Sequence, residues 1–201
     1  MEIIMLLTKF NKILNMKYLI APILLLIIII TSSCDDSVEP TPAKTSGETT
    51  INTKFENSKS TGFSFSQGGN ISFPNSNNIL PDIIVMVQTN EIGKIYGVFL
   101  SPPNGLKPTF NLIKEFNDTD IDSAQVFFSK LNEVPDSNYV YLAIHVKMNQ
   151  IWAVKTNDNK FGEILITHTE AYADSSNPSS PTLYGEVTLK WKYHPNGSRN
   201  F

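Results

Sequence analysis

The stretch from Leu183 to Tyr193 alternates apolar and polar side chains, and this feature constrains the fold more than any other in the sequence. Val187, Leu189 and Trp191 fall on one face of an extended chain, while charged and hydroxyl side chains fall on the other. A period of two residues is typical of a strand with one buried and one solvent-facing side. We therefore expect the C-terminal region to be a half-buried antiparallel strand.

Shorter segments of strand character precede it. The predicted strands are 63–66, 82–88, 95–100, 139–148, 151–156 and 161–168. The last two flank the turn Asn157-Asp158-Asn159-Lys160, which predicts a hairpin. One segment differs, because Ile121, Ala124, Phe128 and Leu131 recur at helical spacing between a capping Thr119 or Asp120 and Pro135. The sequence predicts a mainly β protein, an antiparallel sandwich or open barrel with one short helix.

Composition supports a packed domain and excludes several classes of function. Hydrophobic residues make up 41% of the chain, which is enough to form a packed core. Charged residues make up 17%, which is too few for a disordered chain. The net charge of −3 gives no basic excess for nucleic acid. A single cysteine excludes an intramolecular disulfide and a zinc ribbon. No sequence signature assembles a nucleophile with its base, so we expect a protein that is not an enzyme.

The N-terminus is predicted to direct export. Residues 18–30 form a nearly unbroken apolar run that would reach about 20 Å as a helix, short of the ~30 Å hydrocarbon core. Three lysines precede the run, and Ile30-Thr31-Ser32-Ser33-Cys34 follows, which resembles the lipobox of bacterial lipoproteins. We predict a signal peptide over 1–33 and lipidation of Cys34; an ordinary signal peptide or a short anchor is the alternative. Because Met16-Lys17 leads directly into the apolar run, a further hypothesis is that residues 1–15 reflect a miscalled start.

Residues 34–53 are predicted to be the lipidated cysteine and a flexible linker, because they are rich in Thr, Ser, Pro and Glu. The acidic residues directly after Cys34 resemble the signal that sends some Gram-negative lipoproteins to the outer face of the outer membrane. A solvated acidic linker is the equal alternative. The folded domain is then expected over 54–201.

Four residues are candidates for binding. His145 and His168 lie in predicted strands and could hold a haem iron axially if their strands met across a cleft, with Met86 or Met148 as substitutes. Most strand histidines are satisfied polar groups instead. Trp152 and Trp191 could stack on a sugar or an aromatic ligand, although alternation favours a core position for both.

Three C-terminal stretches, 152–156, 160–166 and 186–201, resemble the end of HmuY-type lipoproteins. In that family a hairpin with a lysine–aromatic pair precedes a strand that ends in Tyr-Gln, followed by an Asp/Asn-Gly-Ser turn and a late phenylalanine. His194 stands here in place of the usual glutamine. The resemblance implies a mostly β domain anchored in the outer membrane. It also implies haem or tetrapyrrole capture between two axial histidines for delivery to a TonB-dependent receptor. His145 and His168 are the plausible pair in this sequence, and neither matches a motif position of the family. The alternative is a surface binding or adhesion module for glycan or protein that keeps the fold without haem.

Overall fold

A computed structural model describes residues 44–103, 105, 107–177 and 181–201. The predicted signal peptide, Cys34 and the first half of the predicted linker lie outside these residues. The elements are β1 (Ser46–Asn52), β2 (Ser60–Ser64), β3 (Gly69–Phe73), β4 (Ile84–Thr89), β5 (Ile95–Ser101), β6 (Phe110–Glu115), α2 (Ile121–Lys130), β7 (Ala143–Val146), β8 (Gln150–Lys155), β9 (Phe161–Asp174) and β10 (Thr182–Tyr193). Within the described ranges, no helix is long and apolar enough to cross a membrane.

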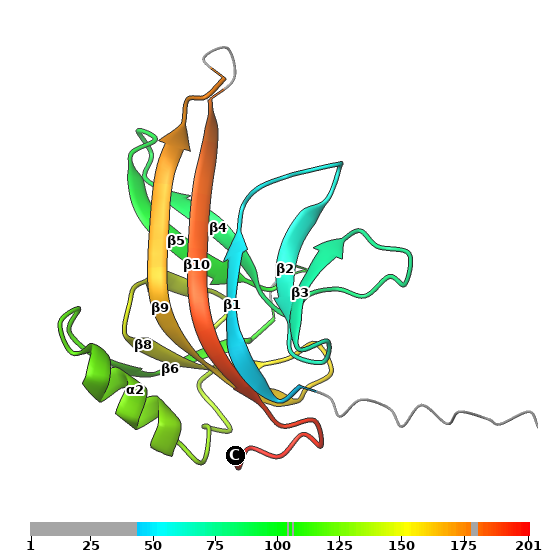
Figure 1. The fold of residues 1–201 in the computed structure, drawn as a ribbon, viewed down its shortest axis with the longest axis vertical. Helices are drawn as coiled ribbons and strands as arrows, with labels where there is room; N and C mark the ends of the chain where they lie inside the picture. The colour runs from blue at the N-terminus through cyan, green and yellow to red at the C-terminus, as the bar shows by residue number, and fades with distance from the viewer. Residues whose placement is uncertain (1–43, 104, 106, 178–180) are drawn as a thin grey trace, which may run out of the picture. The chain divides into compact units, whose positions relative to one another are not determined.

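The strands form three antiparallel sheets, as the alternating sequence predicts. The largest has the order β1-β10-β9-β8-β6, a second has the order β4-β5-β7, and β2 and β3 form a hairpin of their own. The predicted hairpin around residues 157–160 is confirmed, since β8 pairs with β9. The sheets do not close into a barrel, and the arrangement is consistent with a β sandwich (Figure 1). The mainly β prediction is confirmed.

The main core lies between the five-stranded sheet and the three-stranded sheet. Ile166 and Leu189 of the first sheet belong to the same buried cluster as Val98 and Val146 of the second. Gly185 of β10 marks how closely the two layers approach, because a Cβ there would lie 2.8 Å from the Val87 side chain of β4. Glycine is required where one backbone lies this close to another element. Side chains that alternate with these core residues must therefore face outward from each sheet.

The outward side of the five-stranded sheet is covered at one end by α2. Ala124 and Phe128 of the helix bury Ile151 of β8 and Leu165 of β9 in a second apolar cluster. This confirms the predicted helix; Ala124, Phe128 and Leu131 of its predicted apolar face pack here, whereas Ile121 is exposed. Asp120 precedes the helix without a side-chain capping bond, because its carboxylate accepts a hydrogen bond from Asn117 Nδ2 at 3.1 Å instead.

A bulge divides β9 into two parts. In the pairing with β10, Leu189 lies opposite Ile166 and Thr188 lies opposite His168, so Thr167 is the extra residue. One inserted residue moves all following side chains to the other face of the sheet. His168 therefore faces outward, although it has the same parity as the core residue Ile166.

Two sequence-based boundaries are wrong. The predicted flexible linker ran to residue 53, but 46–52 form β1, which pairs with β10 along its whole length and buries Ile51. Polar β1 residues are stabilised by this long pairing, which local composition does not reveal. The predicted strand 139–148 is regular only at 143–146, because the segment passes from one sheet to the other: Val140 bridges β6 at Phe110, whereas the following residues pair with β5.

Candidate functional site

Both tryptophans are core residues. Trp152 is 5% exposed and Trp191 is 1% exposed. The Trp152 indole N–H donates to Gln150 Oε1 at 3.1 Å, and the Trp191 ring packs at 5.2 Å between centroids against Phe63. Stacking on a sugar needs an exposed ring face, which neither side chain offers. The ligand-stacking prediction is therefore wrong, and the core position that alternation favoured is correct.

The two strand histidines lie on different layers of the sandwich. His145 belongs to β7 in the three-stranded sheet, and His168 belongs to β9 in the five-stranded sheet. Both are exposed, while their neighbours Val146 and Ile166 are buried in the core between the sheets. Two axial ligands must share one iron at about 2 Å each, but His145 and His168 lie in different sheets and the bulge turns His168 away from the core, so the structure does not bring them together. The predicted pairing of His145 with His168 is therefore wrong, and each histidine is a separate candidate.

The backbone of His145 is held in an unusual conformation. Its φ of 53° lies in the left-handed region, which is uncommon for residues other than glycine and is adopted most often by Asn, Asp and His among them. Its N–H donates to Gln88 Oε1 at 3.3 Å, and its carbonyl accepts from Gln150 Nε2 at 3.3 Å. Backbone strain of this kind concentrates at functional sites. The two glutamines fix the backbone, and the imidazole remains exposed.

The outward side of the three-stranded sheet is apolar beside His145. Met86 and Ile144 are 44% and 52% exposed, and Phe99 lies directly opposite Met86 on the neighbouring strand. These three residues alternate with core residues, so they face away from the core. We call Met86, Phe99 and Ile144 the apolar outer face.

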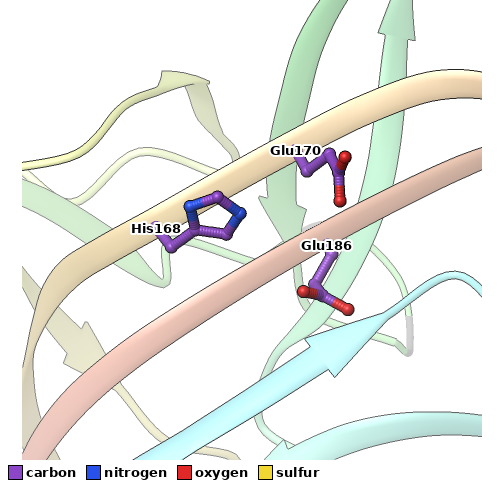
Figure 2. A group of neighbouring side chains, drawn as sticks. All are labelled: His168, Glu170 and Glu186. Atoms are coloured by element: carbon purple, nitrogen blue, oxygen red, sulfur yellow. The ribbon is translucent and has the colours of Figure 1, made fainter.

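The outward side of β9 and β10 is polar beyond the bulge. His168 and Glu170 project from β9, and Glu186 projects beside them from β10 (Figure 2). One ligand atom from each side chain lies within 4.8 Å of the other two. Glu170 and Glu186 are directly opposite each other in the strand pairing. We call His168, Glu170 and Glu186 the His–Glu–Glu cluster.

Two tyrosines flank this cluster on the same side of the sheet. Tyr184 donates a hydrogen bond from its hydroxyl to Glu186 Oε2, and its ring packs at 4.9 Å between centroids against Tyr172. Desolvation, followed by the Glu186 carboxylate, raises the pKa of Tyr184 well above its ordinary value. Lys54 Nζ lies 5.7 Å from the centre of the Tyr184 ring. The Tyr184 hydroxyl therefore stays protonated and orients one oxygen of Glu186.

A third carboxylate on this sheet lies under α2. Glu163 is fully buried, and Lys192 Nζ is 2.6 Å from its Oε1 atom. Lys192 also donates to the carbonyl of Phe128 at the end of the helix. Burial raises the pKa of Glu163 to about 7, although Lys192 opposes the shift and neither carboxylate oxygen has an aligned hydrogen bond. This pair fastens the helix to the sheet.

Sequence reasoning identified His168 but missed its two partners. The spacing of His168 and Glu170 places them on one face of any strand, which is a signal the sequence contained. Glu186 could be added only from the register of β9 with β10, which depends on the bulge at Thr167.

Comparison with known proteins leaves the family open. Scans against protein-family models, curated proteins and solved structures found no match to this chain. The resemblance to HmuY-type lipoproteins and the lipidation of Cys34 stay predictions.

Proposed function

We propose that this protein is a lipid-anchored binding protein of the outer membrane, displayed at the cell surface, that captures haem or a related tetrapyrrole for uptake. The apolar run at 18–30 and Cys34 support the anchor, and the acidic residues that follow support surface display. The C-terminal pattern supports a haem ligand and a TonB-dependent receptor as the recipient. In this proposal the chain binds and delivers its ligand, and it catalyses no reaction.

One observation favours His145 as the iron ligand. His145 is exposed and directly follows Ile144 of the apolar outer face, and Gln88 and Gln150 form hydrogen bonds with its backbone. A porphyrin ring is large and apolar, so it gains free energy by covering apolar side chains such as Met86 and Ile144. A histidine with a thioether is a known axial combination for haem iron, which makes Met86 the candidate second ligand. His168 has carboxylates around it instead and offers no such surface.

The test is a haemin titration of the full chain, purified in detergent and followed by absorbance. Wild-type protein should give a sharp Soret band with low-spin visible bands that saturate at one equivalent. His145→Asn should lose this spectrum, because asparagine tolerates the left-handed backbone but supplies no imidazole. His168→Asn is the matched control and should keep it. A broad band like that of free haemin in the wild type, or an unchanged spectrum in His145→Asn, would contradict the proposal.

A second candidate function is supported by the same surface. Exposed apolar side chains such as Met86 and Ile144 are typical of protein–protein contacts. In this case the apolar outer face would bind a partner protein at the cell surface without haem. Ile144→Glu should then abolish crosslinking to the partner from a photoreactive group at Met86. The two tryptophans no longer support glycan binding, because both are buried.

A further inference from the structure

We propose that the His–Glu–Glu cluster of β9 and β10 is a binding site for a divalent first-row transition metal ion, with Zn²⁺ as the example. The site lies on the opposite layer of the sandwich from His145. This inference does not rest on haem binding, and it adds a second ligand class to the protein.

The geometry brings three suitable ligand atoms together. An imidazole nitrogen and two carboxylate oxygens lie within 4.8 Å of one another, from two strands that are hydrogen-bonded neighbours. Zn²⁺ binds such atoms at about 2.0–2.2 Å, which places ligand atoms roughly 3–4 Å apart. The side chains of His168 and Glu170 are exposed, so small rotations about their χ angles close the remaining gap. The strands themselves need not move.

Charge at the cluster supports a cation. Glu170 and Glu186 are directly opposite in the strand pairing, and like charges at such positions are destabilising. Among the described residues, the ion pairs involve Glu115, Glu133, Asp136 and Glu163, and none involves Glu170 or Glu186. A divalent cation between the two carboxylates would remove this repulsion. Elsewhere on the same sheet, the buried Glu163 has a lysine for this purpose.

The surroundings orient the ligands. The Tyr184 hydroxyl donates to Glu186 Oε2, which leaves Oε1 for the metal. Hydrogen bonds to ligating carboxylates are a regular feature of metal sites. The bulge at Thr167 is what turns His168 toward the two carboxylates. Bulges commonly redirect a side chain at a functional site.

The ligand set defines the class of metal. Imidazole and carboxylate together suit zinc and other first-row divalent ions, whereas calcium and magnesium prefer sites made only of oxygen. Three protein ligands leave at least one coordination position open. A water molecule or a group from a partner would occupy that position.

The experiment is a Zn²⁺ titration of the full chain without a histidine tag, in detergent, in competition with a chromogenic chelator. We expect one Zn²⁺ per chain in the wild type. His168→Ala and Glu186→Gln should each lower the affinity by about 10- to 100-fold or more, and Tyr184→Phe by about tenfold. His145→Asn and Glu48→Gln are matched controls that should bind like the wild type. The substituted side chains of the cluster lie outside the core, and circular dichroism would check that each variant is folded.

Two results would overturn the proposal: no stoichiometric Zn²⁺ binding by the wild type, or binding that His168→Ala and Glu186→Gln leave unchanged. Neither result concerns His145, so failure here is distinguishable from failure of haem binding. A protein that binds Zn²⁺ but gives only a free-haemin spectrum would support this site alone.

Discussion

The outward face of the β9–β10 pair has two halves, which differ in whether their carboxylates have a cationic partner. In the half covered by α2, Glu163 is fully buried and Lys192 lies 2.6 Å away. In the open half beyond the bulge, Glu170 and Glu186 face each other, and His168 lies beside them. The covered half neutralises its carboxylate internally, and the open half leaves two carboxylates available. The difference indicates that one half stabilises the fold and the other is free to bind a ligand.

A comparable contrast separates the two strand histidines. His145 lies beside exposed apolar side chains, whereas His168 lies beside two carboxylates. Imidazole can ligate either a haem iron or a simple metal ion, and the neighbouring side chains decide which ligand is favoured. Predicting the two histidines as one pair combined two surfaces with different chemistry.

The largest expected effect on the free energy of unfolding comes from removing the ion pair of the covered half. Lys192→Met should lower the free energy of unfolding by about 3 kcal/mol at pH 8, because it leaves the buried Glu163 without its cation. Lys190→Met is the matched control on the same strand and face, and it should cost no more than about 0.5 kcal/mol. Urea unfolding measures both. Equal losses in the two variants would show that the covered half does not depend on this pair.

The next effect tests the open half. Zn²⁺ at about 100 times its dissociation constant should raise the free energy of unfolding by about 2.7 kcal/mol, because it binds only the folded chain. His168→Ala should gain almost nothing at the same Zn²⁺ concentration. Urea unfolding with and without Zn²⁺ measures the difference. A full gain in His168→Ala would place the metal elsewhere.

The pH dependence of stability should reveal Glu163. The pKa of Glu163 is raised from 4.5 to about 7 in the folded protein, so the folded state holds a proton that the unfolded state releases. The stabilising contribution is complete below pH 4.5 and is lost as the pH rises through about 7. Relative to Glu163→Gln, the wild type should lose about 2 kcal/mol between pH 5 and pH 8. A difference that is flat with pH, or that rises, would contradict this account of the buried carboxylate.

The smallest expected effect is on the free energy of unfolding when either of two glutamates is replaced, and the two changes should have opposite signs. Without metal, Glu170→Gln should raise the free energy of unfolding by about 0.5 kcal/mol, because it removes the repulsion with Glu186. Glu48→Gln should lower it by about 0.3 kcal/mol, because Glu48 pairs across the strands with Lys190. Thermal unfolding in the presence of a chelator measures both changes. Shifts of the same sign would remove the electrostatic argument for a cation.

Local pattern predicted much of the fold. Alternation identified β10, because one face of this strand packs on the core, and the turn at 157–160 identified the β8–β9 hairpin. Helical spacing identified α2, because Ala124 and Phe128 must meet the sheet on one side. These elements are determined by their own residues, so the sequence is sufficient to find them.

Pairing between strands far apart in the sequence determines the elements that local pattern did not predict. β1 is polar and resembles a linker, and it becomes a strand only because β10 offers it a complete partner. The segment 139–148 looks like one strand, but it contacts two sheets in turn and breaks at the crossing.

The residues of the candidate site were not predicted together from the sequence for a similar reason. One extra residue at Thr167 turned His168 to the outside, where Glu186 joins it through the strand register. No periodicity in the sequence marks that bulge. Periodicity did favour burial of the tryptophans, and the structure agrees.

The most direct test of the account follows each histidine separately. The chain has only three histidines, so long-range ¹H–¹⁵N spectra of the full chain in detergent resolve each imidazole. We predict that one equivalent of Zn²⁺ shifts the nitrogen signals of His168 and leaves those of His145 and His194 in place. One equivalent of haemin should instead broaden the signals of His145 and spare those of His168. If both ligands perturb the same histidine, or neither perturbs any, the division of the surface into two binding faces is wrong.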